Sequence, residues 1–280
     1  MSESKSVKLN NGTLIDRIGL GCWEINGQET VQTVLNAMDC GYRRIDTAAY
    51  YKNETDIGTA IRTYGIPRNE LFIASKLWYE DMQEGRQEES FYQSLENLGL
   101  DYIDMYFLHW PIGEISKSWH VLERLYEARK IRAISVCNFQ PIHLKELLAN
   151  ANVCPAVNQF ESNPRFQQNE TVKFCLKEGI IPEAWGPLGK GRDLSLPLLE
   201  ALAIKYEKTP AQIILRWHLQ RGVLVIPKSV NKDRLRQNLN IFDFSLEEKD
   251  MDAIHALDTG ASLRSYPARY RFDIACEDSD

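Results

Sequence analysis

Short β-rich runs alternate with amphipathic segments along most of the chain. Val31, Val34, Leu35 and Met38 recur at the i, i+3, i+4 and i+7 spacing of one helix face, which predicts a helix over residues 29–39. The same pattern predicts further helices near residues 57–64, 91–98, 117–129, 142–150, 169–178, 196–206 and 210–220. Strands are expected at 18–21, 44–46, 71–75, 103–108, 131–136, 155–159, 180–184 and 223–227.

The two ends of the chain carry their own signals. Residues 7–9 precede Asn11-Gly12, a pair typical of a tight turn, which predicts a small N-terminal β-hairpin. Thr209 and Gln212 form a capping box with Pro210 at the first helical position. Residues 245–248 form a second capping box that is expected to open a late helix, and the chain after residue 260 reads as a tail.

Eight strand–helix alternations predict either a doubly wound sheet or a closed barrel. The first strand ends in Gly19-Leu20-Gly21-Cys22-Trp23, which lacks the G-x-G-x-x-G fingerprint of dinucleotide-binding sheets. The segment Gly186-Pro187-Leu188-Gly189-Lys190-Gly191 resembles a phosphate loop only superficially, because no G-K-[ST] follows. We therefore predict an α/β fold in which residues 1–280 form one domain, a (β/α)8 TIM barrel with a short N-terminal β-hairpin.

Composition excludes several classes of function. The 280 residues carry a net charge of −6, which disfavours general binding to nucleic acid or anionic membranes. No apolar run reaches the ~20 residues of a membrane span, and the N-terminus lacks a signal-peptide core. The six cysteines are scattered and the five histidines show no metal-ligand spacing. We expect a cytoplasmic protein with reduced thiols and no metal.

Polar side chains end three consecutive expected strands. Asp46, Lys76 and His109 each follow an apolar run, and Asn158-Gln159 ends the sixth strand. Singly, each is more simply read as a cap, a solvated lysine or a structural histidine. In a barrel, however, the carboxyl ends of the strands meet at one mouth, where the chemistry of such folds occurs.

A tyrosine completes this set. Tyr51 and Tyr50 both lie in the loop after Asp46, and spacing alone does not choose between them. A nearby ammonium such as Lys76 lowers the pKa of a phenol and improves it as an acid, while a neutral imidazole can orient a carbonyl oxygen. The set suits protonation of a carbonyl while another group delivers hydride.

These segments resemble the aldo-keto reductases across essentially the whole chain. The matching segments, in the family's order, are Asp46-Thr47-Ala48-Ala49-Tyr50-Tyr51-Lys52-Asn53-Glu54, Ser75-Lys76-Leu77-Trp78, Leu108-His109-Trp110-Pro111, Ser135-Val136-Cys137-Asn138-Phe139, Val157-Asn158-Gln159, Trp185-Gly186-Pro187-Leu188-Gly189 and Ile226-Pro227-Lys228-Ser229. The resemblance implies a reductase of aldehydes and ketones in which Asp46, Tyr51, Lys76 and His109 are the catalytic tetrad. It selects Tyr51 over Tyr50 as the acid.

The resemblance also implies the contacts to the cofactor. Asn138 and Gln159 would hold the nicotinamide carboxamide, so that the pro-R hydrogen is transferred. Three positions depart from the common pattern: Cys137 replaces Ser, Trp185 replaces the stacking Tyr, and Gln237 replaces Glu. The remaining expected cofactor contacts are Gly21, Cys22, Trp23, Asp46, Gly186, Pro187, Leu188, Gly191, Lys228, Ser229, Val230, Arg234 and Asn238.

A cationic cluster follows the eighth expected strand. Lys228, Lys232, Arg234 and Arg236 lie within nine residues of an otherwise acidic chain. The cluster is either a solvated helix end or a phosphate site, and barrels commonly bind phosphate at this place. Arginine can contact two phosphate oxygens at once, so we predict NADPH rather than NADH.

Tryptophans near the strand ends predict the substrate pocket. Trp23, Trp78 and Trp110 would line an aromatic pocket together with Tyr51 and His109. The segment after Pro111 is short, because helical pattern resumes by about residue 117. An open pocket and broad specificity for small aldehydes, ketones or ketoacid-type compounds are therefore expected.

Three questions stay open at this stage. The tail, with Arg264, Tyr266, Arg269, Tyr270 and Arg271, either covers the pocket or packs elsewhere. The barrel could instead be a non-catalytic module that binds NADPH, although the complete tetrad argues against this. A Schiff-base enzyme using Lys76 would leave Tyr51, His109 and the cations unexplained. The resemblance implies a monomer.

Overall fold

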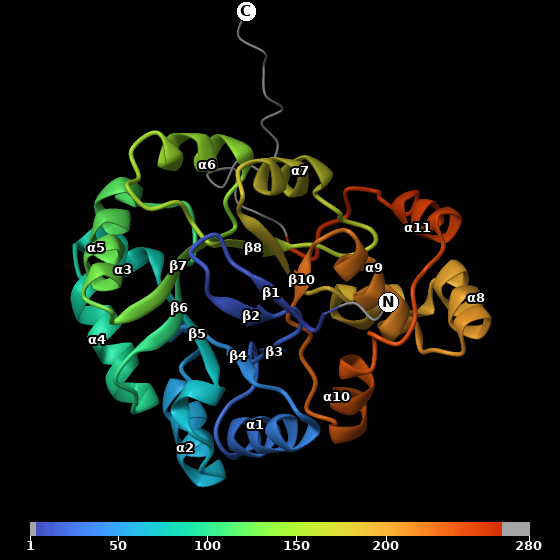
Figure 1. The fold of residues 1–280 in the computed structure, drawn as a ribbon, viewed down its shortest axis with the longest axis horizontal. Coiled ribbons are helices and arrows are strands. Elements are labelled where there is room, and N and C mark those ends of the chain that lie inside the picture. Colours follow the sequence, from blue (N-terminus) through green and yellow to red (C-terminus); the bar gives the residue numbers. More distant parts are fainter. Residues whose placement is uncertain (1–3, 265–280) are drawn as a thin grey trace, which may run out of the picture.

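Eight parallel strands form the centre of the molecule, and helices surround them (Figure 1). The computed structural model describes residues 4–264. In sheet order the strands are β3 (Leu20–Gly21), β4 (Arg44–Asp46), β5 (Phe72–Leu77), β6 (Ile103–Leu108), β7 (Ile131–Cys137), β8 (Val157–Glu161), β9 (Ile181–Trp185) and β10 (Leu224–Val225). A parallel bridge between Ile18 and Val225 joins the two edges. The prediction of a closed barrel rather than a doubly wound sheet is confirmed.

The helices agree with the predicted positions to within a few residues, apart from those at Tyr79–Glu84 and Lys232–Leu239, which were not predicted. They are α1 (Gln28–Cys40), α2 (Glu54–Tyr64), α3 (Tyr79–Glu84), α4 (Gln87–Leu98), α5 (Ile115–Glu127), α6 (Pro141–Leu148), α7 (Asn169–Lys177), α8 (Pro197–Tyr206), α9 (Pro210–Gln220), α10 (Lys232–Leu239) and α11 (Glu248–His255), with short 3-10 helices at Ala49–Tyr51, Arg68–Glu70 and Gly189–Ser195. Within the described part of the chain, none of these helices has the length and apolar character needed to cross a membrane.

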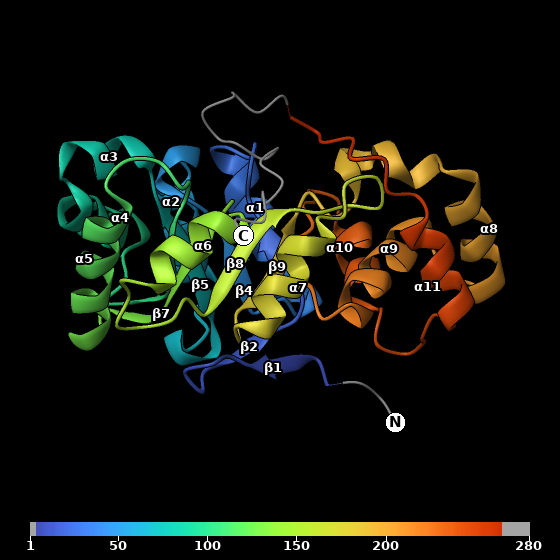
Figure 2. The ribbon, with the colours of Figure 1, turned by 90° about the horizontal axis from the view of Figure 1, so that it is seen from above.

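The predicted N-terminal hairpin is present and closes one end of the barrel (Figure 2). Strand β1 (Ser6–Lys8) pairs antiparallel with β2 (Leu14–Asp16). Leu9 and Ile15 are buried in one cluster with Phe72 and Met105, which belong to β5 and β6. Burial of such side chains stabilises the fold by roughly 1.5–3 kcal/mol each. The hairpin therefore fills the amino-terminal end of the barrel and leaves the carboxyl ends of the strands for chemistry.

One predicted capping box is confirmed and the other is wrong. The Thr209 side chain accepts a hydrogen bond from the Gln212 backbone N–H at the start of α9. Helix α11 begins only at Glu248 with Glu247 at the N-cap position, and the Ser245 hydroxyl accepts a hydrogen bond from Arg216. The six-residue helix α3 was not predicted, since Met82 is its one buried residue and leaves no periodic face to detect.

Gly21 allows the barrel to close tightly beside the mouth. Its backbone N–H donates to the Pro227 carbonyl at 3.2 Å. A Cβ at this position would lie 2.7 Å from the Ile226 carbonyl oxygen, closer than a carbon atom can approach. Only glycine therefore fits at this position, where β3 meets the segment that follows β10.

Candidate active site

A cavity of about 1030 Å³ opens at the carboxyl ends of the strands. All the residues expected to contact cofactor or substrate line it, from Gly21 at the end of β3 to Asn238 in α10. Asp46, Tyr51 and His109 line it as well, whereas Lys76 lies behind them and is fully buried. The structure thus brings the predicted site residues together at one mouth.

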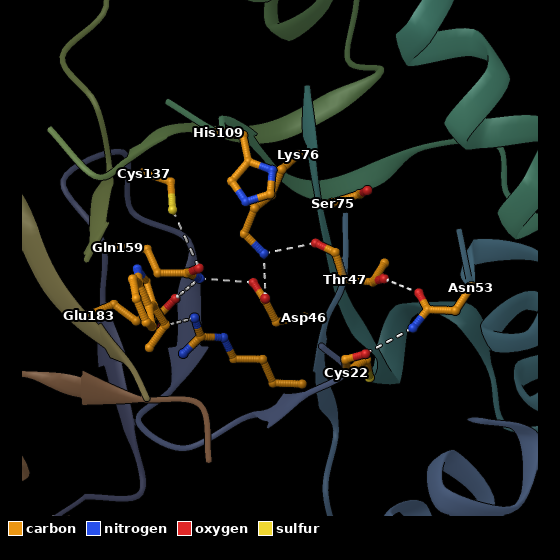
Figure 3. Close-up of polar contacts among 12 residues, drawn as sticks. Cys22, Asp46, Thr47, Asn53, Ser75, Lys76, His109, Cys137, Gln159 and Glu183 are labelled. Carbon is orange, nitrogen blue, oxygen red and sulfur yellow. Dashed lines mark hydrogen bonds and ion pairs between the residues drawn. The ribbon is translucent and has the colours of Figure 1, made fainter. Parts of the chain in front are cut away.

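Asp46 holds the Lys76 ammonium in place. Lys76 Nζ lies 2.5 Å from Asp46 Oδ1 and donates to the Thr47 carbonyl at 2.8 Å. Burial acts to lower the pKa of Lys76, but the charge of Asp46, its hydrogen bond and smaller contributions from neighbouring groups together raise the pKa. The side chain therefore stays protonated beside the cavity, and its nitrogen points toward Asp46 and the Thr47 carbonyl (Figure 3).

Tyr51 faces this ammonium, and Tyr50 does not. The Tyr51 ring centroid lies 5.2 Å from Lys76 Nζ and 5.8 Å from the His109 ring centroid. Tyr50 is 44% exposed and stacks on Trp78 instead. Both tyrosines belong to one 3-10 helix, so adjacent side chains point in different directions.

The pKa of Tyr51 differs in direction from the expectation. Burial raises it, while the Lys76 ammonium acts in the opposite, lowering direction. The contribution expected from Lys76 is present, but in the described structure burial outweighs it. The phenol is therefore protonated at neutral pH, as a proton donor must be at the start of a reaction.

His109 follows β6 directly and is held neutral. Burial and then the charges of Lys76 and Arg264 lower its pKa well below the usual value. Its Nδ1 atom is buried and has no hydrogen-bond partner among the described residues. A neutral imidazole can donate one hydrogen bond, so this side chain can orient a ligand oxygen in the cavity.

Aromatic rings form one wall of the cavity. The Tyr50 ring stacks between Trp23 and Trp78, with centroid separations of 5.7 and 3.9 Å. Trp23 also contacts Tyr51 edge-on at 4.7 Å, and Trp110 lines the same space. Only a short connection separates Trp110 from α5, as the sequence predicted. The sequence had indicated Tyr50 only as an alternative proton donor to Tyr51, and its packing role was not predicted.

Two amides and an indole meet next to Tyr51. Asn138 adopts a left-handed backbone conformation with φ of 65°, which Asn tolerates better than most residues. This turn brings its Oδ1 to 2.8 Å from Trp185 Nε1, which donates, and its Nδ2 to 3.0 Å from the His109 carbonyl. The Cys137 thiol donates to Gln159 Oε1 at 3.6 Å, a long contact typical of a weak donor.

The four predicted cations separate into two pairs. Lys228 and Arg234 line the cavity beside Ser229 and Gln237. Lys232 pairs with Asp39 at 2.7 Å and Arg236 with Asp233 at 3.2 Å, and neither lines the cavity. Asn231 caps α10 by accepting from the Arg234 backbone N–H. One part of the cavity is thus cationic and the other aromatic, a division that fits a dinucleotide with an extra phosphate.

The mouth also holds two charged residues that were not predicted and, from the tail, Arg264, for which the sequence left open whether it covers the pocket. Glu24 and Lys190 come from different loops and form an ion pair at 3.8 Å along the cavity. Arg264 lies over the rings of Trp23 and Trp185 at 5.6 and 5.3 Å. The preceding Leu263 N–H donates to buried Glu161 at 2.6 Å, which anchors this segment. Tyr266, Arg269, Tyr270 and Arg271 of the predicted tail lie outside the described residues.

Comparison with known proteins agrees with the geometry of the site. Residues 17–259 match the model of the Aldo/keto reductase family. The chain is 48% identical to a glyoxal reductase of Bacillus subtilis over 95% of this chain and 98% of that protein. It is 40% identical to a methylglyoxal reductase of Yersinia pestis over 98% of this chain and all of that protein.

Two solved structures share the fold. An aldo/keto reductase of Brucella melitensis superposes with a TM-score of 0.88 at 42% identity, covering 92% of this chain and 99% of that one. An aldo-keto reductase complexed with NADPH superposes with a TM-score of 0.89 at 32% identity, covering 95% of this chain and 91% of that one.

Proposed function

Because this chain belongs to the aldo/keto reductase family, we propose that it reduces aldehydes and ketones to alcohols, with Tyr51 as the proton donor and NADPH as the reductant. The observation that carries the proposal is the meeting of Tyr51, Lys76 and His109 beside one cavity. A phenol, an ammonium and a neutral imidazole together can protonate and orient a carbonyl oxygen.

The residues of the cavity fit NADPH. The cationic pair Lys228 and Arg234 would hold the 2′-phosphate, and Gln237 and Asn238 the adenine. Trp185 would stack on the nicotinamide, while Asn138 and Gln159 would bind its carboxamide. When bound there, NADPH supplies the hydride that reaches the carbonyl carbon.

The protein's own groups handle the proton. His109 donates a hydrogen bond to the carbonyl oxygen and holds it near the Tyr51 hydroxyl. Tyr51 gives its proton to that oxygen as the alcohol forms, and the resulting phenolate is stabilised by the Lys76 ammonium. Asp46 keeps this ammonium in place. After the product leaves, the Tyr51 phenolate regains a proton from water.

The substrates are small carbonyl compounds. The connection between β6 and α5 is too short to form a lid, and the aromatic wall offers few polar groups for selecting one substrate. Glyoxal and methylglyoxal, for which two relatives are named, are suitable members of a first panel. We also propose that the protein acts as a monomer in the cytoplasm, which light scattering and cell fractionation would test.

The experiment that tests this function follows NADPH absorbance with a panel of aldehydes and ketones. Reduction of several small members, with the Tyr51→Phe variant inactive on all, supports the proposal. A chain that binds NADPH but reduces none of them is a binding module instead. Strict selectivity for one bulky carbonyl would contradict the broad specificity.

A Schiff-base reaction at Lys76 is a poor alternative. Its amine is protonated and fully buried against Asp46, whereas a Schiff base needs a neutral amine that reaches the substrate. Borohydride added with a carbonyl compound in the absence of NADPH should therefore leave Lys76 unmodified in a peptide map, whereas exposed lysines can react.

A further inference from the structure

Glu183 is part of a buried polar network that the proposed mechanism does not use. It lies on β9 with no solvent exposure, directly beside Gln159 of β8 in the sheet register. One carboxylate oxygen accepts from Gln159 Nε2 at 2.7 Å, and the other pairs with the Arg44 guanidinium. Figure 3 shows the Glu183 and Gln159 side chains directed toward each other below Cys137.

Gln159 donates to two carboxylates with the same nitrogen. Its second contact is Asp46 Oδ2 at 3.0 Å. Ionised carboxylates only accept hydrogen bonds, so the amide NH2 group must face Glu183 and Asp46. With the amide turned over, its oxygen would face two anions. The charges therefore fix one orientation of the Gln159 side chain.

Arg44 supplies a buried counter-charge to Glu183. Its guanidinium is fully buried, and burial lowers its pKa only to about 10, so it is charged at neutral pH. Its NH1 atom also donates to the Asp16 carbonyl of the hairpin at 3.1 Å. Loss of Glu183 alone would remove the carboxylate that contacts this buried cation, which is strongly unfavourable.

The fixed orientation leaves Gln159 Oε1 free to accept on the cavity side. Its one protein contact among the described residues is the weak Cys137 thiol. We propose that Glu183, held by Arg44, is a positioning residue that turns Gln159 so that Oε1 accepts a hydrogen bond from the nicotinamide carboxamide NH2. This inference rests on the proposed NADPH-dependent reduction. Glu183 itself touches neither substrate nor cofactor in this role.

A cofactor analogue tests the acceptor without any mutation. In the 3-acetylpyridine analogue of NADP+, a methyl group replaces the carboxamide NH2. Kd values from quenching of tryptophan fluorescence should be about tenfold higher for the analogue than for NADP+, because a buried acceptor loses its donor. Equal Kd values in the wild-type protein would overturn the proposal.

Variants test whether Glu183 provides the orientation. Arg44→Met/Glu183→Met removes both buried charges together, which folds commonly tolerate. The discrimination between NADP+ and the analogue should fall below about threefold, while the Kd of 2′,5′-ADP, which lacks nicotinamide, stays unchanged. If this variant does not fold, Glu183→Gln carries the same test with a smaller expected loss of discrimination.

Two controls separate positioning from a general effect on the fold. Arg44→Lys keeps the ion pair and should keep the discrimination. Asp104→Asn removes another fully buried carboxylate, paired with Arg68 and Arg132, and should change stability alone. Unchanged discrimination in the Glu183 variants, or equal weakening of NADP+ and 2′,5′-ADP, would overturn the role of Glu183. A wild-type chain that binds neither ligand contradicts the proposed function itself.

Discussion

Lys76 Nζ lies 5.2 Å from the centroid of the Tyr51 ring, although the two residues belong to different elements of the barrel. The ammonium comes from β5 and the phenol from the 3-10 helix after β4. Asp46, at the end of that same strand β4, fixes the ammonium at 2.5 Å. The pair therefore depends on neighbouring strands keeping their register, in which Asp46 lies opposite Ala74.

Replacement of Tyr51 by Phe should abolish the proton donor and keep the aromatic packing. General acid catalysis contributes about 10²–10⁴-fold, so kcat for aldehyde reduction should fall by at least about a hundredfold. Steady-state kinetics with NADPH measure this loss. Tyr50→Phe is the matched control, because its ring stacks on Trp78 and its hydroxyl is not part of the mechanism. Equal losses in both variants would contradict the assignment of Tyr51.

Asp46→Asn should cost both stability and activity. The variant leaves the fully buried Lys76 ammonium without its carboxylate, which destabilises folds by about 3–5 kcal/mol. Urea unfolding measures this change. In Asp46→Asn/Lys76→Met the unpaired charge is gone, so stability should recover toward wild type while activity stays low. Recovery of both together would show that the pair has no role in catalysis.

Arg234→Ala should reduce the preference for NADPH over NADH by roughly 10–100-fold, because a charge-assisted contact to phosphate is lost. The ratio of kcat/KM for the two cofactors, measured with one aldehyde, gives this preference. Arg236→Ala lies on the same helix α10 and removes a cation already paired with Asp233. That control should leave the ratio within about twofold.

Stability should decrease as the pH falls below about 6.5. The pKa values of buried His109 and His218 are lowered well below the usual value, chiefly by burial. Below pH ~6.5 the unfolded chain binds protons that the folded chain does not, so the free energy of unfolding falls by up to about 1.4 kcal/mol per pH unit per histidine. Urea midpoints at two pH values measure the slope, and His218→Gln should reduce it. An unchanged midpoint would contradict buried neutral histidines.

Activity should behave differently from stability over the same range. Because His109 stays neutral in the folded protein, kcat/KM should show no loss with an apparent pKa near 6.5. A pH profile of aldehyde reduction, recorded where the protein remains folded, measures this. A fall centred near pH 6.5 that disappears in His109→Gln would show that the histidine titrates in the active protein.

The fold was predictable because its signals are local. The Asp46 and His109 positions follow from apolar runs that end in a polar residue, and Asn11-Gly12 marks the hairpin within a few residues of its strands. Thr209 and Gln212 cap α9 through contacts that span three residues. The Ser245 capping box is absent, and the partner that its hydroxyl has instead, Arg216, lies 29 residues earlier in the chain.

The unpredicted parts of the site depend on contacts between distant strands. Glu183 precedes Ala184 and Trp185 in a short strand, where one acidic residue looks like any solvated charge. Its partner Arg44 lies 139 residues earlier, and only the closed barrel joins them. The choice of Tyr51 over Tyr50 likewise depends on how a 3-10 helix turns, which spacing does not reveal.

The N-terminal hairpin has a further consequence for the electrostatics of the barrel. Its Asp16 carbonyl accepts from Arg44, and Ile15 covers the same end of the barrel. The family match begins at residue 17, just beyond the hairpin. A protein shortened to that point would retain every proposed catalytic side chain, but water could reach Arg44 from the amino-terminal end of the barrel. The higher dielectric constant there would weaken each charge–charge interaction between the barrel's amino-terminal end and Lys76.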